Sequence, residues 1–261
     1  MQDTIDLDRI LRTTFVASAE YHPTLTSTNE QAARLAGGNC PPLPLLVVAG
    51  QQTAGRGRGT NRWWTGPGSL AFSLLLDPAE PAAPEGPRST MLALAAGIAV
   101  ADALTPLLPA ETVGIHWPND VMAGRRKLSG ILVEVLPDGR SIVGIGVNTN
   151  NTAADAPPEI QALVGTVRDL SGLSHDQTAL LWAILGQFEQ RLAQVAAEAR
   201  LLAARADALC SQRGRQLSVQ RGNEVITGLC LGLGPDGALL LETPAGRRAV
   251  YSGVVLTPPV A

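Results

Sequence analysis

Residues 42–76 read "PLPLLVVAGQQTAGRGRGTNRWWTGPGSLAFSLLL", two apolar runs separated by a loop rich in glycine and arginine. The first run has the length and β-branched content of a buried strand, and "GSLAFSLLL" indicates a second strand that leaves the loop. We therefore expect the loop "TAGRGRGTNRWW" (residues 53–64, below the Gly/Arg loop) to join two core strands. An arbitrary loop of this composition is usually only a solvated basic turn.

The Gly/Arg loop also has the chemistry of an anion site. The alternating glycines of "AGRGRG" (residues 54–59) permit close backbone approach and positive φ angles. Arg56 and Arg58 can form paired hydrogen bonds to carboxylate or phosphate oxygens. Trp63 or Trp64 can stack on a purine or exclude water. No G-x-x-x-x-G-K-[ST] stretch occurs, so any bound nucleotide is not held by a Walker-type loop.

The segments around this loop alternate between helix and strand patterns. Before it, "LTSTNEQAARLAGG" combines a Ser27–Glu30 capping box with good helix formers, so a helix should begin at Ser27 or Thr28. After it, "STMLALAAGIAVADALTPLL" predicts a buried helix. Three further strands are expected at "TVGIHW", "KLSGILVEVL" and "SIVGIGVNT", the first two joined by the turn-rich link "PNDVMAGRR".

The last third of the chain changes from a helical pattern to a pattern of short strands. Residues 178–210 have apolar positions at helical spacing and predict one or two long amphipathic helices. From residue 211 onward, short strands with tight turns suggest a small barrel appended to the main domain. There "GLGPDG" matches G-x-G-x-x-G but opens no helix, so it predicts a Pro-Asp-Gly turn and not a dinucleotide site.

Composition limits the classes of partner. The 261 residues are 45% hydrophobic with a formal charge of −3 and a pI near 5.6, so no global positive field favours nucleic acid. The three cysteines are far apart in sequence and indicate no disulfide framework, which fits a reducing cytoplasm. The three histidines have no metal-ligand spacing. Neither a signal peptide nor an apolar run of about 20 residues is evident, so we expect no membrane anchor.

A second polar cluster lies in "HWPNDVMAGRRKLSG" (residues 116–130). Asn119 and Asp120 can cap a turn, or Asp120 can hold Mg²⁺ or orient an attacking amine. Lys127 can offer a point charge to a phosphate, whereas Arg125–Arg126 is interpreted as a pair of surface charges. In "GIGVNTN", Asn148 stands at a strand end, where a turn role and a ligand contact both stay open.

In this order, "STNE", "QTAGRGRG" with the following Trp63, "WPNDV", "KLSGILVE", "GIGVN" and the C-terminal barrel resemble the biotin protein ligase family. The resemblance spans residues 22–257. It implies an α/β (α+β) fold, with a mixed β-sheet flanked by helices in a catalytic domain like that of class II aminoacyl-tRNA synthetases, and an SH3-like C-terminal barrel. The expected domains are residues 1–210 and 211–261.

The resemblance also implies an ATP-dependent, AMP-forming ligase. Biotin's carboxylate attacks the α-phosphate of Mg-ATP to give biotinyl-5'-adenylate, and the Gly/Arg loop closes over this intermediate. A lysine of a biotin carboxyl carrier protein then takes the biotinyl group. The implied cofactors are ATP, biotin and Mg²⁺. The expected protein is a cytoplasmic, stand-alone ligase without a helix-turn-helix repressor domain, a monomer or homodimer, with no nucleic-acid or membrane partner.

Site residues are carried over by position in the motifs. The implied biotin contacts are Ser27, Thr28, Asn29, Gln52, Arg56, Gly57, Arg58, Lys127 and Gly130. The implied ATP contacts are Arg58, Trp63, Asn119, Lys127 and Asn148, with Trp63 on the adenine. The implied catalytic residues are Lys127, Arg56, Arg58 and Asp120, with Asp120 assisting amine attack.

Two positions depart from the family pattern. A further Gly-Arg pair is replaced by Thr60–Asn61, and a lysine before "WPND" is replaced by His116, which can still act as a donor. Three other functions are less consistent with the sequence. A lipoate-attaching ligase lacks this loop pattern, a non-catalytic biotin or adenylate sensor does not need Lys127 with both loop arginines, and a nucleic-acid-binding module conflicts with the pI.

Overall fold

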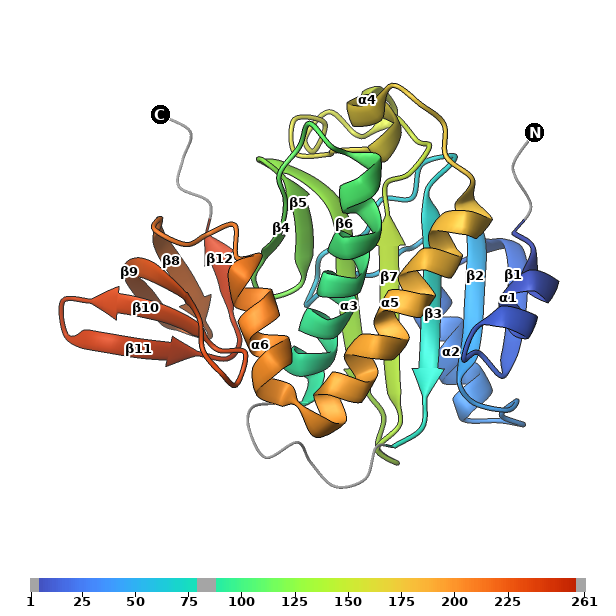
Figure 1. Ribbon diagram of the computed structural model, residues 1–261, viewed down its shortest axis with the longest axis horizontal. Coiled ribbons are helices and arrows are strands. Elements are labelled where there is room, and N and C mark those ends of the chain that lie inside the picture. The colour runs from blue at the N-terminus through green and yellow to red at the C-terminus, as the bar shows by residue number, and fades with distance from the viewer. Residues whose placement is uncertain (1–4, 79–87, 257–261) are drawn as a thin grey trace.

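The computed structural model describes residues 5–78 and 88–256, which form a large helix-covered sheet and a smaller sheet beside it (Figure 1). The large sheet has seven strands in the order β1-β2-β3-β7-β6-β5-β4. β1 and β2 are parallel, and the other neighbours are antiparallel, so the sheet is mixed as predicted. Its strands are β1 (Ser18–Leu25), β2 (Leu45–Gln52), β3 (Leu70–Leu76), β4 (Val113–His116), β5 (Asp120–Ala123), β6 (Arg126–Val135) and β7 (Ser141–Val147).

The strands on either side of the Gly/Arg loop, β2 and β3, lie inside the sheet, which confirms that prediction. They pair antiparallel from Leu45↔Leu75 to Ala49↔Ala71, and every residue of β3 is buried. A strand with helices over both faces reads as a continuous apolar run, because successive side chains point to opposite layers. The same burial holds the two ends of the loop in fixed positions.

Two strands of the large sheet were not predicted. β1 contains Pro23, which cannot donate to a ladder, but β1 is an edge strand with only β2 as its neighbour. β5 has only four residues and lies inside the segment interpreted as a turn-rich link. It pairs with β4 on one side and β6 on the other, so the link is itself part of the sheet.

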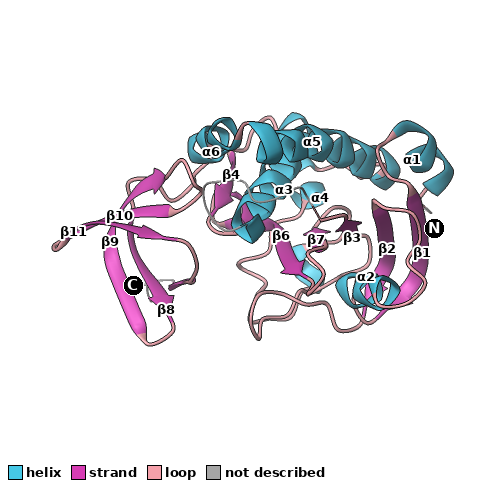
Figure 2. Ribbon diagram, turned by 90° about the horizontal axis from the view of Figure 1, so that it is seen from below, coloured by secondary structure: helices cyan, strands magenta, loops and turns pink. Residues whose placement is uncertain are grey.

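Helices cover both faces of the large sheet (Figure 2). On one face α3 (Arg88–Leu104) packs against α5 (Gln177–Ala197) and α6 (Ala199–Ala208), and α1 (Leu7–Thr13) packs on β1. On the other face α2 (Thr28–Ala36) packs on β2, β3 and β7. Short helical turns complete the domain: Thr105–Leu107, Ala153–Asp155 and α4 (Val167–Ser171).

The helix α2 begins where the sequence predicts, but not through the expected capping box. Ser27 occupies the N-cap position without a side-chain cap bond, and Glu30 instead accepts a hydrogen bond from the Thr26 hydroxyl at 2.9 Å. The Ser27 hydroxyl is therefore not committed to the helix.

The helix α3, with the turn that follows it, corrects the expectation about apolar runs. Residues Arg88–Leu107 have a mean hydropathy of 1.6, and by length and composition alone this segment is long and apolar enough to cross a membrane. In the structure 72% of this apolar stretch is buried inside the protein, between the sheet and α5. A helix that is apolar on most of its surface is expected in a protein core or in a membrane, and here the sheet and α5 supply the apolar surroundings.

Five antiparallel strands form the small sheet in the order β11-β10-β9-β8-β12, in agreement with the predicted C-terminal β-domain. They are β8 (Gln216–Arg221), β9 (Glu224–Leu233), β10 (Leu239–Thr243), β11 (Gly246–Val250) and β12 (Val254–Leu256). "GLGPDG" is the turn between β9 and β10, as predicted, with Gly237 at φ 79°. The linker before β8 lies beside β4 and is joined to it by a hydrogen bond, in which the Ile115 N–H donates to the Leu209 carbonyl at 2.7 Å.

Two of the three cysteines lie close together in the fold although they are far apart in the sequence, and all three are free thiols. The thiols of Cys210, in the linker, and Cys230, on β9, form a hydrogen bond with each other. This bond lowers the pKa of Cys210 to about 7, while the same bond together with burial raises the pKa of Cys230. Fold topology thus places a pair of reduced thiols where the two sheets meet.

We expect iodoacetamide at about pH 7.5 to label Cys210 at least about 10-fold faster than Cys230, because the thiolate is the reactive species and Cys230 is 1% exposed. Timed alkylation followed by peptide mass mapping measures both rates. Labelling in concentrated guanidinium chloride is the control and should remove the difference. Equal rates in the folded protein would contradict the inequality of the two thiols.

Candidate active site

A cavity of about 920 Å³ opens between the large sheet and the small sheet. Its walls come from the start of α2, the end of β2, the Gly/Arg loop, β4 to β7, the linker before β8, and β12. This volume is typical of sites that enclose a whole small-molecule ligand. The predicted site residues that line it are Ser27, Thr28, Asn29, Gln52, Arg56, Gly57, Arg58, Trp63, Asn119, Asp120, Lys127 and Gly130.

Asn148 is the predicted ATP contact that lies outside this lining. Its side chain is 2% exposed and donates to the Lys127 carbonyl at 3.1 Å, while its oxygen accepts from Asn151. The amide therefore holds the strand that carries Lys127. A contact of Asn148 with ATP stays a prediction without support from this arrangement.

The first turn of α2 is tied to the end of β2. The backbone N–H of Thr28 and its hydroxyl both donate to the Gln52 side-chain oxygen, at 2.8 and 3.2 Å. The Gln52 nitrogen donates to Thr65 at 3.3 Å, and the buried Ser73 hydroxyl oxygen lies 2.7 Å from the Thr28 hydroxyl oxygen. These bonds fix the direction of each polar group before any ligand arrives, which is what a selective polar site requires.

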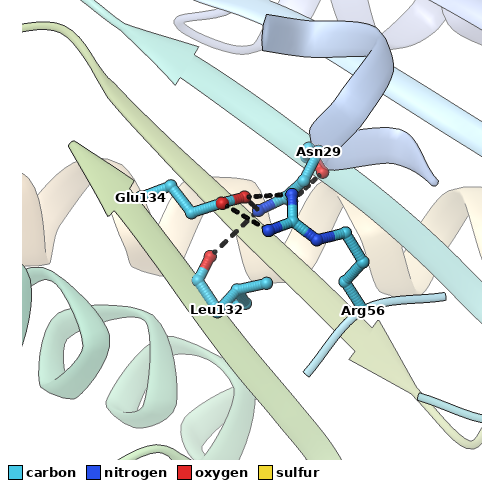
Figure 3. A network of polar contacts seen from close by, with 5 residues as sticks. Asn29, Arg56, Leu132 and Glu134 are labelled. Atoms are coloured by element: carbon cyan, nitrogen blue, oxygen red, sulfur yellow. Dashed lines mark hydrogen bonds and ion pairs between the residues drawn. The ribbon is translucent and has the colours of Figure 1, made fainter. Parts of the chain in front are cut away.

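A second polar network crosses from α2 to β6 (Figure 3). The Asn29 nitrogen donates to Glu134 Oε2 at 2.7 Å and to the Leu132 carbonyl at 3.5 Å, while its oxygen accepts from Ser73 at 2.6 Å. Arg56 of the Gly/Arg loop reaches the same carboxylate, with Nη2 3.0 Å from Oε1 and Nη1 3.3 Å from Oε2. Asn29 thus connects the helix, the sheet core and, through Glu134, the loop.

The Gly/Arg loop is a small hairpin. The Gly57 N–H donates to the Asn61 carbonyl at 2.9 Å, and the Trp63 N–H donates to the Gly55 carbonyl at 2.9 Å. Gly59 lies at the tip with φ 63°, a conformation that favours glycine. This pairing carries the chain back so that Trp63 lies over the sheet, and Arg56 and Arg58 reach polar partners.

The cavity floor is made flat by glycines on neighbouring strands. Gly130 on β6 is the cross-strand partner of Gly146 on β7. A Cβ atom at Gly146 would lie 2.3 Å from the indole of Trp63, and one at Gly144 would lie 2.0 Å from Asn29 Oδ1. These close approaches explain the two glycines of "GIGVN": a side chain at Gly146 would displace the indole, and one at Gly144 would break the Asn29 network.

Lys127 stands at the entrance of β6 with its backbone fixed on both sides. Its N–H donates to the Leu163 carbonyl at 2.7 Å, and its own carbonyl accepts from the Gly165 N–H at 3.0 Å. The ammonium lies 2.7 Å from Asp120 Oδ1 and 5.5 Å from the centre of the Trp63 ring. A fixed backbone and a counter-charge together hold this cation inside the cavity.

Arg58 links the Gly/Arg loop to the small sheet. Its Nη1 donates to the carbonyl of Gly253, in the connection to β12, at 3.2 Å. Burial lowers the pKa of Arg58 and the nearby Asp120 charge raises it, and an arginine so placed stays charged at physiological pH. The guanidinium is therefore a half-buried cation that connects the Gly/Arg loop to the small sheet.

The cavity lining contains further cations that were not predicted from the sequence. Arg125, interpreted as a surface charge, is exposed but lies in the lining, as do Arg62 of the loop and Arg215 of the linker. Asp120 is the only carboxylate among the described lining residues. Because the cations outnumber the acid, the cavity favours an anionic ligand.

His116 also faces this cavity. Burial lowers its pKa most strongly, the charge of Asp120 opposite it on β5 raises the pKa, and Arg215 and Lys127 lower it. The ring is therefore neutral at physiological pH, unlike the lysine that the family pattern has at this position.

The described residues contain no cluster of three histidine, cysteine, aspartate or glutamate side chains that could hold a metal ion. Mg²⁺ that arrives with a nucleotide takes most of its ligands from phosphate and water, with one or two protein carboxylates. Asp120 is the lining carboxylate that fits this need. A resident metal is not required for an Mg-ATP substrate to bind.

The mixed sheet, the Gly/Arg hairpin and the cationic cavity define a cofactor-attaching ligase: residues 22–150 match the family described as "Biotin/lipoate A/B protein ligase family". Residues 214–256 match the family "Biotin protein ligase C terminal domain". The chain belongs to the biotin protein ligase family.

Individual relatives agree with this assignment. The chain is 32% identical to the bifunctional ligase/repressor BirA of Bacillus subtilis, over 89% of this chain and 71% of that protein. It is 32% identical to the biotin--[acetyl-CoA-carboxylase] ligase of Mycobacterium tuberculosis, over 87% of this chain and 83% of that one. The biotin protein ligase of Aquifex aeolicus in complex with biotin and ATP superposes with a TM-score of 0.80 at 29% identity, covering 92% and 98% of the two chains.

Proposed function

We propose that this chain activates biotin with Mg-ATP and transfers the biotinyl group to a lysine on a carrier domain of a biotin-dependent carboxylase. One observation carries the proposal: in a member of the biotin protein ligase family, the start of α2, the Gly/Arg loop and Lys127 line one cationic cavity. The cavity has both the polar fixed groups that a ureido ring needs and the cations that phosphates need.

In the first step, a carboxylate oxygen of biotin bonds to the α-phosphorus of ATP, and the bond to the β-phosphate breaks to release pyrophosphate. Both reactants are anions, so fixed cations lower the barrier by offsetting their repulsion. We assign this role to Arg56, Arg58 and Lys127. Arg56 is 45% exposed in its ion pair with Glu134, so leaving that partner for a ligand costs little.

The biotin ring needs polar partners with fixed directions. Thr28 and Gln52 are already oriented by their mutual hydrogen bonds, and the Ser27 hydroxyl has no cap bond to give up. Trp63 covers the floor, and its indole N–H is buried without a hydrogen-bond partner. A ligand acceptor at that N–H would remove an unfavourable buried donor, which supports a direct contact with Trp63.

In the second step, the ε-amine of the carrier lysine attacks the acyl carbon of the adenylate, the bond to AMP breaks, and the nitrogen loses a proton. We assign Asp120 to orient the attacking amine, because it is the acid in the lining and lies beside Lys127. The Gly/Arg hairpin and Trp63 exclude water from the anhydride, which otherwise hydrolyses.

Pyrophosphate exchange tests the first step. We expect exchange of labelled pyrophosphate into ATP to depend on biotin and to be at least about 100-fold weaker with lipoate, because an apolar dithiolane leaves the polar groups around Gln52 unpaired. Equal stimulation by both acids would refute biotin as the substrate.

Transfer tests the second step in the same preparation. With biotin, Mg-ATP and a carrier domain, the mass of the carrier should increase by one biotinyl group at its acceptor lysine. A carrier in which that lysine is replaced by arginine is the control. Exchange without transfer to any carrier domain tested would contradict the second step, whereas binding of biotin without exchange would identify a non-catalytic sensor.

A further inference from the structure

Gln212 lies fully buried, at 0% exposure, between the backbone of Trp117 and the ring of His116. Its side-chain oxygen accepts from the Trp117 N–H at 2.7 Å. Its side-chain nitrogen lies 3.1 Å from His116 Nε2. Gln212 belongs to the linker before β8, whereas His116 ends β4, so this contact joins segments 96 residues apart.

The orientation of the Gln212 amide follows from its backbone partner. A peptide N–H can only donate, so the atom 2.7 Å from the Trp117 nitrogen must be the amide oxygen. The amide NH₂ group then faces His116, and because it can only donate, His116 Nε2 must accept. An imidazole whose Nε2 is an acceptor is neutral and carries its proton on Nδ1.

The other nitrogen of the ring is the one available to a ligand. His116 lines the cavity, and its Nδ1 has no hydrogen-bond partner among the described residues while not being enclosed by protein atoms. The charged groups around the ring are Asp120 on β5, Lys127 on β6 and Arg215 in the linker. This is the cationic part of the cavity, where an anion is expected.

We propose that Gln212 is a positioning residue that keeps His116 neutral with its proton on Nδ1, so that His116 offers a fixed N–H donor to an anionic oxygen of the ligand. That this oxygen belongs to the nucleotide phosphates rests on the function proposed above. The linker thereby contributes to the site through the tautomer of a residue on another strand.

This arrangement keeps the charge of the cavity constant with pH. Protonation of His116 would place an N–H at Nε2 against the NH₂ group of Gln212, two donors facing each other. Reversing the amide would in turn place its NH₂ group against the Trp117 N–H. Burial and the cations Lys127 and Arg215 also oppose a charged ring, and only Asp120 favours it.

The tautomer is directly measurable by ¹⁵N NMR of the full chain with labelled histidine. His116→Asn identifies the resonances of His116 among those of the three histidines. We expect the Nδ1-protonated pattern, with the pKa of the ring below the ordinary histidine value. An Nε2-protonated ring, or a ring that titrates near pH 6.5, would overturn the assignment.

Gln212→Glu reverses the hydrogen bond at His116, because the added carboxylate can only accept. We expect the proton to move to Nε2 and the pKa of His116 to rise by more than about one unit. The matched control is Gln216→Glu, which adds the same charge to the same cavity lining without a bond to His116. A shift no larger in Gln212→Glu than in Gln216→Glu would overturn the positioning role.

Gln212→Ala covers the case in which the charged variant fails to fold in a melting curve. Without the amide, both tautomers should appear and titration should return toward the ordinary range; an unchanged pure Nδ1–H pattern would again refute the role of Gln212. Retention of the Nδ1–H form throughout would show that another group fixes the ring.

The donor function is tested by adding Mg-ATP, with and without biotin. The Nδ1–H proton of wild-type His116 should shift downfield and exchange more slowly with water, and no change in either condition would overturn the ligand contact. Pyrophosphate exchange in wild type should show no inflection from a histidine between about pH 6 and 8, whereas Gln212→Glu should introduce one. If biotin-dependent exchange is absent, the proposed function fails, while the tautomer experiment on the free protein still decides the role of Gln212.

Discussion

Lys127→Ala is expected to slow formation of biotinyl-adenylate by about 100- to 1000-fold in a protein that folds normally. The ammonium lies in the cavity beside Asp120 and over Trp63, where it can meet the carboxylate of biotin and the α-phosphate of ATP. A fixed cation contributes most where negative charge develops in the transition state. Single-turnover adenylate formation and a melting curve, measured on the same samples, give both quantities.

Two variants make this experiment specific. Arg126→Ala removes a neighbouring, exposed cation that does not line the cavity, and should leave the single-turnover rate within about 2-fold. Lys127→Arg should recover only part of the rate, because a planar guanidinium cannot place its charge at the same point. The ion pair with Asp120 is partly exposed, so Lys127→Ala should cost no more than about 1 kcal/mol of stability. Normal turnover in folded Lys127→Ala would remove Lys127 from the mechanism.

Asn29→Asp is expected to lower the free energy of unfolding at neutral pH by about 3 kcal/mol, although it only replaces the side-chain NH₂ group with a carboxylate oxygen. The Asn29 nitrogen donates to Glu134 at 2.7 Å, and a carboxylate there would repel Glu134 and leave no donor between them. At about 3 °C per kcal/mol, the melting temperature should fall by about 9 °C, and biotin-dependent exchange should fall with it because the start of α2 is displaced.

The effect of Asn29→Asp should depend on pH with a definite sign. Burial and Glu134 raise the pKa of the added carboxyl group in the folded state above its unfolded value of about 4. The destabilisation is therefore complete above the folded pKa and disappears as pH falls toward about 4. Asn61→Asp adds the same group in the exposed loop and should show little effect at any pH. A stability difference that does not narrow in acid would argue against the carboxylate contact.

The central part of the fold could be predicted from the sequence because buried elements require apolar residues, and these residues form recognisable runs in the sequence. β2 and β3 are covered on both faces, so their buried residues are apolar apart from Ser73, and α3 is mostly apolar for the same reason. β1 and β5 could not be predicted, because an edge strand tolerates Pro23 and a four-residue strand leaves too short a pattern. Their positions depend on neighbours that are distant in sequence.

The site was predictable to the extent that its residues lie in local motifs. The start of α2, the Gly/Arg loop and Lys127 all have such motifs, and all line the cavity. Gln212 and Arg215 have none, because they enter the site only when the linker folds back against β4. The contact between Cys210 and Cys230 was missed for the same reason. The roles carried over for individual site residues stay predictions until they are measured.

If Arg58 binds the ligand as predicted, its hydrogen bond to Gly253 makes ligand binding and the docking of the small sheet thermodynamically linked. One guanidinium serves both, so a ligand that draws Arg58 toward its phosphates changes the free energy with which the small sheet is held. Linkage is reciprocal: whatever factor the ligand exerts on docking, docking exerts on ligand affinity. The small sheet thus acts on the cavity as an allosteric effector would, although it belongs to the same chain. The ligand affinity of the isolated large domain would therefore differ from the ligand affinity of the whole chain.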